Sequence, residues 1–358
     1  MDNPEMGEKI QKLRRHIGDR HNVLVWITLI FILALGLGFV NIVVSNLGLE
    51  EKDALLGVTF SKIYAEELGL DWKEAYLATL DDLKIKTYRL PAYWSEIEPE
   101  PEVFDFTDLD WQIDEATRHG AQVILAVGRK LPRWPECHVP KWSVGLDEEL
   151  VRVRIMSMIE TVIRRYASNP TVVAWQVENE PFFEFGECPK PDAAFLGQEI
   201  AAVHALDARP VVISESGELS TWVRAASLAD ILGISTYRIV WSRFTGYFYW
   251  PVTPRVYQQR ALAASALVKK IIITELQGEP WATQPIISMP LDQQLTLMNP
   301  ERLMSNVVFA RKIGVSEIYL WGVEWWYWLK QQGRPQMWEA AKVLFLAPQN
   351  NVQPPALP

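Results

Sequence analysis

Short apolar runs alternate with longer amphipathic stretches along most of the chain. Eight apolar runs have the length of buried strands: Ala54–Phe60, Ile85–Leu90, Gln122–Val127, Val172–Val177, Pro210–Ser214, Ile231–Ser235, Ile271–Thr274 and Glu317–Leu320. The stretches between them have the length of helices, for example Asp71–Leu83, Asp108–His119, Asp147–Tyr166, Asp192–Leu206 and Pro300–Ile313. Several begin with an acidic first turn or a proline at the first helical position, which favours a helix start. Eight strands that each precede a helix predict an α/β fold, the closed (β/α)8 TIM barrel.

An open, doubly wound parallel sheet is the alternative to a closed barrel. That fold normally carries a glycine-rich phosphate-binding turn after its first strand. The segment Gly57–Phe60 shows no such pattern, and no GxxxxGKS/T motif occurs in the chain. The sequence therefore favours a barrel, which we expect to occupy residues 47–345 without an internal linker.

A different pattern precedes the barrel. Val23–Val40 is a continuous apolar run apart from Thr28, and with Ile42–Val44 it becomes long enough to span a bilayer. A core helix would show polar residues at every turn. A cleaved signal peptide, the other alternative, has a shorter apolar region and a small-residue cleavage site, which Val43–Ser45 matches poorly. We therefore expect a single transmembrane signal-anchor helix at residues 22–46.

Charges on either side of this span set its expected orientation. The residues before it include five basic ones: Lys9, Lys12, Arg14, Arg15 and Arg20. The segment after it is mostly acidic and begins at Glu50. The positive-inside rule then places residues 1–21 in the cytoplasm and the barrel outside it. In that location Cys137 and Cys188 can form a disulfide if the fold brings them together.

Composition narrows the classes of ligand and partner. The net charge of −9 lacks the basic excess of a nucleic-acid-binding protein. Two cysteines and five scattered histidines form no cluster with metal-ligand spacing, so we expect neither a metal nor a cofactor. The last residues, 346–358, are rich in proline and amides and are predicted to be a disordered tail.

Sixteen tryptophans are many for this length, and some of them must fill the core. Several fall beside predicted strand ends: Trp94, Trp134, Trp142, Trp321, Trp325 and Trp326. Flat apolar rings at the mouth of a barrel suit the C–H faces of sugars. We expect Trp321 and Trp94 to contact a carbohydrate substrate. The aromatic segment Trp241–Pro254 is expected to form one wall of a binding groove.

Two glutamates are the candidate catalytic residues. The active sites of such barrels lie at the carboxyl ends of the strands. Glu180 follows the fourth predicted strand and Glu275 follows the seventh, so the two side chains face each other across the mouth. Glycoside hydrolysis with retention needs two carboxyl groups about 5–5.5 Å apart, one protonated and one ionised. We therefore expect Glu180 and Glu275 to act on a glycosidic bond.

Other side chains at the strand ends fit the same task. Arg89 is placed to keep a carboxylate ionised, and Tyr237 is placed to donate its hydroxyl to that carboxylate. Asn179 has both a donor and an acceptor for a sugar hydroxyl. Trp321 is placed to form the floor of the pocket for the cleaved sugar.

Two segments resemble the clan A retaining glycoside hydrolases, the superfamily of cellulases, β-galactosidases and β-glycosidases. Asn179–Pro181 is similar to the acid/base motif of that clan, and Arg89–Pro99 followed by Val103–Phe106 is similar to its second-strand segment. The resemblance covers residues 54–345. It implies Glu180 as acid/base, Glu275 as nucleophile, Asn179 on the sugar 2-hydroxyl, and Arg89 and Tyr237 around the nucleophile. It also implies hydrolysis of a β-linked sugar, or its α-L-arabino equivalent, with retention.

One segment departs from the clan pattern. Many members carry a histidine near the end of strand three, where this chain has Val127–Lys130. We expect Arg129, Lys130 and Arg133 to lie in a solvated loop, and the alternative is that they meet an acidic sugar.

Other glutamates compete with the chosen pair. Glu215 also ends a strand and is the rival of Glu275, but we expect it to cap the segment near Ser220. Glu136 and Glu187 are expected to be solvated loop charges. Glu324 is expected either at the surface or on substrate, and no role is assigned to Glu178.

These observations predict a membrane-anchored, extracytoplasmic retaining glycosidase that acts on oligo- or polysaccharides. One alternative is a cell-surface transglycosylase that uses the same residues. The other is a non-catalytic carbohydrate-binding barrel, which would have no need for both Glu180 and Glu275.

Overall fold

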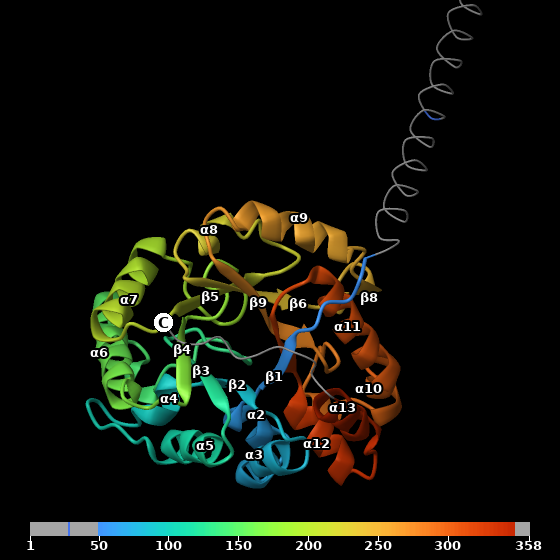
Figure 1. Cartoon of the computed structure of the whole chain (residues 1–358). Helices are drawn as coiled ribbons and strands as arrows, with labels where there is room; N and C mark the ends of the chain where they lie inside the picture. The colour runs from blue at the N-terminus through green and yellow to red at the C-terminus, as the bar shows by residue number, and fades with distance from the viewer. Residues whose placement is uncertain (1–27, 29–48, 348–358) are drawn as a thin grey trace, which may run out of the picture. The chain divides into compact units, whose positions relative to one another are not determined.

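The computed structural model describes residue 28 and residues 49–347, and its centre is a closed barrel of parallel strands (Figure 1). The strands follow the order β1-β10-β9-β6-β5-β4-β3-β2 around the barrel. Their bounds are β1 Leu55–Thr59, β2 Thr87–Pro91, β3 Gln122–Val127, β4 Val172–Val177, β5 Val211–Ser216, β6 Ile231–Thr236, β9 Lys270–Gln277 and β10 Glu317–Trp321. Each one overlaps a predicted strand, so the predicted barrel is confirmed.

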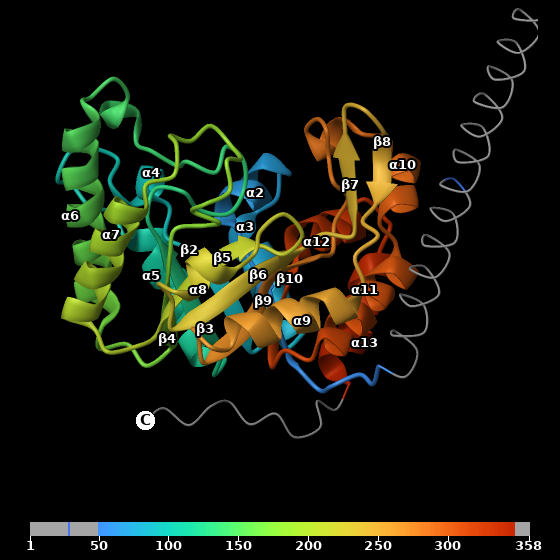
Figure 2. The ribbon, with the colours of Figure 1, turned by 90° about the horizontal axis from the view of Figure 1, so that it is seen from above.

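Helices surround the barrel and cover the outer faces of its strands (Figures 1 and 2). Their bounds are α2 Lys62–Glu67, α3 Trp72–Asp81, α4 Trp94–Ile97, α5 Thr107–Arg118, α6 Glu148–Tyr166, α7 Ala193–Leu206, α8 Val223–Ala226, α9 Pro254–Ala264, α10 Leu291–Leu297, α11 Pro300–Ile313, α12 Val323–Gln331 and α13 Gln336–Leu346, with short 3-10 turns at Lys141–Ser143 and Ile286–Ser288. The side chains of Asp71, Asp147 and Asp192 accept backbone N–H bonds at the starts of α3, α6 and α7. Such caps satisfy N–H groups that a helix start leaves free.

The barrel interior changes from apolar to polar towards the carboxyl ends of the strands. Its lower layer is an apolar cluster of Ile124, Ala174, Val212, Ile231, Ile272 and Tyr319. Side chains alternate along a strand, so the residue two positions later also faces inward. On β4 and β5 those residues are Gln176 and Ser214, which are fully buried, and on β6 the inward residue four positions after Ile231 is Ser235. The apolar layer thus closes the bottom of the barrel, and polar side chains gather above it.

A hairpin interrupts the chain between β6 and β9. Strands β7, Ile239–Ser242, and β8, Gly246–Tyr249, pair antiparallel, and Figure 2 shows them beside α10, on the opposite side from α6 and α7. This hairpin overlaps the aromatic segment Trp241–Pro254, which was expected to form one wall of a binding groove. The segment is half-buried or exposed over most of its length.

A disulfide joins Cys137 to Cys188. It links the loop between β3 and α6 to the loop between β4 and α7, two connections at the carboxyl end of the barrel. The sequence left this pairing open, and the fold brings the two cysteines together.

Apart from residue 28, the predicted anchor at residues 22–46 lies outside the described residues, as do the basic segment 1–21 and nearly all of the tail. Within residues 49–347, no helix has the length and apolar character that crossing a membrane requires.

Candidate active site

Glu275 lies near the end of β9 with both carboxylate oxygens engaged. Arg89 Nη1 donates to Oε1 at 2.9 Å, and the Tyr237 hydroxyl donates to Oε2 at 2.9 Å. Arg89 is fully buried and the Glu275 side chain is 5% exposed. The positive charge of Arg89 therefore compensates the negative charge of Glu275 in a place that holds little water.

A register shift in β9 turns Glu275 into the barrel mouth. Ile234 pairs with Ile273, but the next residue, Ser235, pairs with Glu275, so Thr274 is an extra residue. Without this bulge, Glu275 would share the outward face of Ile273, because alternate side chains point to opposite faces. The shift gives Glu275 the inward direction of its partner Ser235.

Glu180 lies directly after β4, where the backbone is strained. Glu178 and Glu180 have φ of 58° and 43°, a left-handed conformation that costs energy for residues other than glycine. Hydrogen bonds to neighbouring strands and loops hold this turn: Ser214 Oγ accepts from Glu180 N at 2.9 Å, and Lys130 Nζ donates to the Glu180 carbonyl at 3.0 Å. The turn thereby presents the Glu180 side chain to the mouth.

The carboxyl group of Glu180 holds a proton at neutral pH. Burial raises its pKa to about 8, and the negative charge of Glu275 adds to the effect, while the hydrogen bond from Ser235 opposes it. Ser235 Oγ donates to Glu180 Oε1 at 2.6 Å. Ser235 is thus both the strand partner of Glu275 and the hydrogen-bond partner of Glu180. The mouth therefore joins one protonated and one charge-compensated carboxyl group.

Asn179 connects the two sides of this site. Its Oδ1 accepts from Arg89 Nη2 at 2.6 Å and from Ser214 Oγ at 3.1 Å, and its Nδ2 donates to Glu136 Oε2 at 3.1 Å. Below it, Gln176 Oε1 accepts from Arg89 Nε at 2.7 Å. Arg89 thus fixes the positions of Glu275, Asn179 and Gln176 together.

Trp321 lies at the end of β10 and is 7% exposed. The guanidinium of Arg133 lies 3.9 Å from the centre of its ring, and its indole N–H donates to Glu279 Oε1 at 2.9 Å. Arg133 also forms ion pairs with Glu279 and Glu324 and contacts the Tyr64 ring at 3.6 Å. One face of the expected sugar platform is therefore covered by a cation from the β3–α6 loop.

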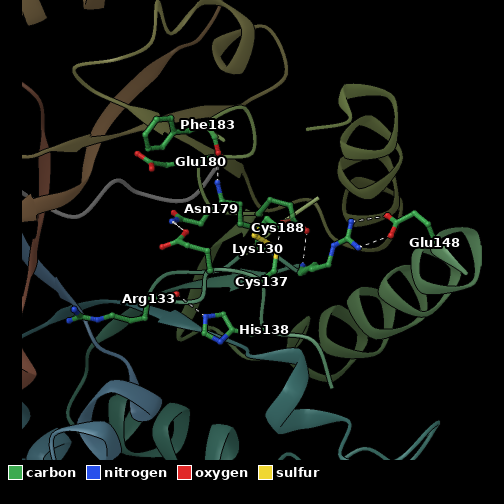
Figure 3. The surroundings of a disulfide bond; sticks show 12 residues. Lys130, Arg133, Cys137, His138, Glu148, Asn179, Glu180, Phe183 and Cys188 are labelled. Atoms are coloured by element: carbon green, nitrogen blue, oxygen red, sulfur yellow. Dashed lines mark hydrogen bonds and ion pairs between the residues drawn. A yellow bond between two sulfur atoms is a disulfide. The ribbon is translucent and has the colours of Figure 1, made fainter. Parts of the chain in front are cut away.

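The expectation of a solvated cationic loop is wrong for two of its three residues. Arg133 and Lys130 are 5% and 7% exposed. Lys130 Nζ donates to the carbonyls of Glu180 and Phe183. Figure 3 shows these three residues in the surroundings of the disulfide. Only Arg129 reaches the surface, where it pairs with Glu148 at 3.0 Å.

Two glutamates differ from their expected places, and a third, Glu178, to which the sequence assigned no role, has a structural one. Glu324 is fully buried against Arg133 instead of at the surface. Glu136 is 7% exposed and bonded to Asn179 instead of solvated. Glu178 accepts the backbone N–H groups of Arg129 and Lys130 at 2.7 and 2.6 Å, so it ties the end of β3 to the end of β4.

Glu215, the rival nucleophile, has a different environment from Glu275. Burial raises its pKa, and the Ser220 hydroxyl is among its hydrogen-bond partners. Ser220 lies in the segment that Glu215 was expected to cap.

Trp94 does not fit its predicted contact with substrate. It is fully buried at the start of α4, its indole N–H donates to Glu98 at 2.6 Å, and its ring packs edge-on against Trp142. Trp325 and Trp326 are fully buried as well. These rings therefore belong to the core.

A different set of aromatic rings leads outward from the nucleophile. Tyr237 contacts Trp281 with ring centres 5.5 Å apart, Trp281 contacts Phe185 at 6.1 Å, and Phe185 contacts Trp134 at 6.1 Å. Trp134 is 58% exposed. We call these four residues the aromatic rim. It joins the buried site to the surface.

Sequence reasoning missed several residues of the site. Ser235 and Gln176 could have been predicted from the sequence, because each is a polar residue at an inward position of a predicted strand. Glu136 could not have been predicted, because only the fold shows that its loop turns into the mouth of the barrel. Within residues 49–347 there is no group of three or more histidine, cysteine or acidic side chains that would hold a metal ion.

Comparisons with known proteins point to one group of enzymes. A family model described as Beta-galactosidase, Glyco_hydro_42, matches residues 71–154, which include β2 and the Arg89–Pro99 segment. Beta-galactosidase Bga of Halorubrum lacusprofundi is 27% identical over 129 residues, which cover 29% of this chain. The match spans 17% of the length of that relative.

Solved structures share the fold over most of the chain. A GH5_18 protein from Streptomyces cattleya in complex with GlcNAc has a TM-score of 0.57 and 13% identity, over 86% of this chain and 83% of that one. Xylanase 10B from Thermotoga maritima has a TM-score of 0.51 and 12% identity, over 75% of this chain and 83% of that one. At these identities the likeness shows the fold alone.

The family match and the curated relative support the expected class of enzyme, a glycosidase. The resemblance that the sequence predicts is thereby confirmed: the chain is similar to the glycoside hydrolases of clan A.

Proposed function

We propose that the chain is a retaining glycosidase that cleaves a β-linked sugar, with Glu275 as nucleophile and Glu180 as acid/base. The observation that carries the proposal is the difference between two neighbouring carboxyl groups. Arg89 and Tyr237 hold Glu275 as an acceptor, while burial and the charge of Glu275 keep a proton on Glu180. Paired carboxyl groups in such different environments are the requirement of a double displacement.

In the first step, Glu275 attacks the anomeric carbon and forms a glycosyl ester. The bond from that carbon to the leaving oxygen breaks, and the proton of Glu180 moves to this oxygen. Esterification removes the negative charge of Glu275, which helped to raise the pKa of Glu180. The pKa of Glu180 therefore falls, so Glu180 stays ionised after it gives up its proton and is free to accept one in the second step.

In the second step, water attacks the anomeric carbon of the ester. Glu180 takes a proton from the water, the bond to Glu275 breaks, and the sugar leaves with its original anomeric configuration. Both carboxyl groups return to their starting states. Asn179, in contact with Arg89 and next to Glu180, is placed to bind a hydroxyl of the same sugar.

The aromatic rim supports an oligo- or polysaccharide as substrate. Trp134, Phe185 and Trp281 continue outward from Tyr237, so further sugar rings have apolar faces to contact. The similarity to a β-galactosidase makes β-galactosides the first substrates to try.

A panel of chromogenic β-glycosides tests the activity, and Glu275→Gln and Glu180→Gln test the assignment. Each change is expected to lower kcat by several orders of magnitude while the barrel still folds. Glu215→Gln is the matched control, because Glu215 is another buried glutamate at a strand end, and it should keep far more activity. A Glu275→Gln enzyme with near-normal turnover would remove the assignment.

A fluorosugar that traps the ester separates an enzyme from a carbohydrate-binding barrel. Mass spectrometry should find the sugar on the peptide that contains Glu275. Azide should rescue a Glu275→Gly enzyme and give a glycosyl azide of inverted configuration. Product analysis with added acceptor sugars then distinguishes hydrolysis from transglycosylation.

We further propose that residues 22–46 anchor the chain in a membrane, with the barrel outside the cytoplasm. The apolar run, the basic residues before it and the Cys137–Cys188 disulfide support this location, because disulfides persist in oxidising compartments. The full chain should remain in the membrane fraction after a carbonate wash, whereas a chain without residues 1–46 should not. Release of the full-length protein into the carbonate supernatant would contradict the proposed membrane anchor.

A further inference from the structure

Glu136 is a third carboxyl group in the mouth of the barrel. Its Oε2 accepts from Asn179 Nδ2 at 3.1 Å, and Asn179 in turn contacts Arg89. The charges of Glu275 and Glu180 both act on it. Glu136 is 7% exposed, so it lies among the catalytic groups with a small part still open to solvent.

The backbone around Glu136 holds this position firmly. Glu136 has φ of 72°, its N–H donates to the Arg133 carbonyl and its carbonyl accepts from Leu131 N, both at 2.7 Å. The next residue, Cys137, forms the disulfide to Cys188. Gly186 packs so closely that an added Cβ would lie 2.6 Å from the Glu136 Cβ. A side chain held this way is preorganised for a ligand.

The charges of the site leave Glu136 without a contacting cation. Arg89 pairs with Glu275, and Lys130 donates its bonds to the carbonyls of Glu180 and Phe183. Among the residues that the structure describes, Glu136 forms no ion pair. Burial, and then the charge of Glu275, raises the pKa of Glu136, while the charge of Lys130 opposes this. In the free protein the raised pKa favours the protonated acid, and a cation that arrives with the ligand would shift Glu136 to the carboxylate.

The geometry of the proposed reaction limits where that cation can be. The anomeric carbon must lie between Glu180 and Glu275, and its two neighbours in the ring are the ring oxygen and C2. The ring oxygen has no hydrogen to donate to a carboxylate. Glu136 is bonded to Asn179, which is placed to bind a hydroxyl of the same sugar, so we assign the substituent on C2 to Glu136.

We propose that Glu136 is a specificity-determining residue that binds the ammonium group of a 2-amino-2-deoxy sugar at the cleaved position. This inference rests on the proposed glycosidase function and narrows its substrate class to glycosides of unacetylated amino sugars. A neutral 2-hydroxyl donates a hydrogen bond but brings no charge, and an N-acetyl group removes the charge. The net charge of −9 also favours the approach of a cationic saccharide.

The test compares aryl β-glycosides that differ only at C2, bearing an ammonium, a hydroxyl or an acetamido group, in both the gluco and the galacto series. The wild-type chain should prefer the ammonium substrates in kcat/KM. Glu136→Gln should lower the ratio of ammonium to hydroxyl substrates by about 10- to 100-fold, as expected for the loss of a charged hydrogen bond. Glu136→Asp, which keeps the charge, should retain part of the preference.

Glu187→Gln is the matched control, because Glu187 is an exposed glutamate beside the other cysteine of the disulfide. In Glu187→Gln the ratio of kcat/KM for ammonium and hydroxyl substrates should equal that of the wild type. Thermal melting of each variant shows whether it folds. Calorimetric titration of the wild type with glucosamine and with glucose needs no variant, and the amino sugar should bind more tightly.

The outcomes separate this inference from the proposed function. Suppose that the hydroxyl substrates are turned over and that the ratio of kcat/KM for ammonium and hydroxyl substrates is the same in wild type and Glu136→Gln. This result would overturn the role of Glu136 and leave the proposed glycosidase function in place. Equal affinities for the two sugars in calorimetry would overturn it as well. No turnover of any substrate together with no fluorosugar adduct on Glu275 would remove the proposed function itself.

Discussion

Arg89 and Glu275 form an ion pair across the barrel mouth, with Arg89 Nη1 donating to Glu275 Oε1 at 2.9 Å. They come from β2 and β9, strands that do not pair with each other. The other guanidinium nitrogens bind Gln176 and Asn179. One side chain therefore sets the position of the proposed nucleophile and of the residue next to the proposed acid.

Arg89→Lys should lower kcat by about 100-fold, because a single ammonium group cannot hold three partners in place. Arg89→Met should also lower the free energy of unfolding by about 3–5 kcal/mol, since it leaves Glu275 as a buried charge without a cation. Steady-state kinetics and urea unfolding measure the two effects. Arg129→Lys, which alters a surface ion pair, is the control. Wild-type kinetics in Arg89→Lys would contradict this role.

The rate should fall as the pH rises through about 8. Glu180 must hold its proton to act as the acid, and burial with the charge of Glu275 raises its pKa to about 8. The pH profile of kcat/KM measures this alkaline limb. In Glu275→Gln the pKa of Glu180 should move down, because the repulsion is gone, and carbon NMR of labelled glutamate follows it. A rate that stays constant through this pH range would argue against Glu180 as the acid.

The same raised pKa predicts how stability changes with pH. The unfolded chain ionises Glu180 near the ordinary glutamate value, whereas the folded chain does so only at about 8. Stability is therefore greatest below the unfolded pKa and is lost as the pH rises through the folded one. As the pH rises from about 5 to about 8, the unfolding free energy of Glu180→Gln should therefore increase relative to that of the wild type by on the order of 3 kcal/mol. Urea unfolding at both values tests this, with the exposed Glu187→Gln showing no such gain.

The sequence predicts the barrel well because the patterns that indicate strands and helices lie within short segments of the chain. Each strand is an apolar run, and the carboxyl ends of parallel strands meet at one edge, so Glu180, Glu275, Arg89 and Tyr237 are expected together. The inward direction of Glu275 depends on a register shift against β6, and no local pattern contains that shift. These four residues were thus predictable, but the orientation of Glu275 was not.

The loop charges were not predictable, because their partners are far apart in the sequence. Arg133 in a polar loop indicates a solvated charge, since burying a lone charge costs much free energy. Its partners Glu279 and Glu324 are 146 and 191 residues away. Only the closed barrel brings these residues together, and the same holds for Glu136 and Asn179.

Arg133→Met should destabilise the fold more than most surface changes do. It leaves the buried carboxyl groups of Glu279 and Glu324 without their cation, which costs about 3–5 kcal/mol of unfolding free energy. Adding Glu324→Gln should recover part of the loss, because one of the two charges is then gone. A double-mutant cycle in urea measures this coupling. Simple additivity of the two changes would show that Arg133 and Glu324 do not act together.

The disulfide should stabilise both the fold and the position of Glu136. Cys137 and Cys188 are 51 residues apart, and closing a loop of that length contributes about 4 kcal/mol in the chain-entropy model. Reduction should therefore lower the melting temperature. It should also raise KM, because Cys137 directly follows Glu136 and the loop that carries both becomes free to move.

The Cys137→Ser, Cys188→Ser double variant separates the bond from the reagent. It should melt at the temperature of the reduced wild type and should not respond to added reductant. Mass spectrometry after alkylation confirms the redox state of each sample. If fully reduced wild type keeps its melting temperature and its KM, then Lys130, Arg133 and Glu178 alone hold the loop, because their bonds to the barrel do not depend on the cysteines.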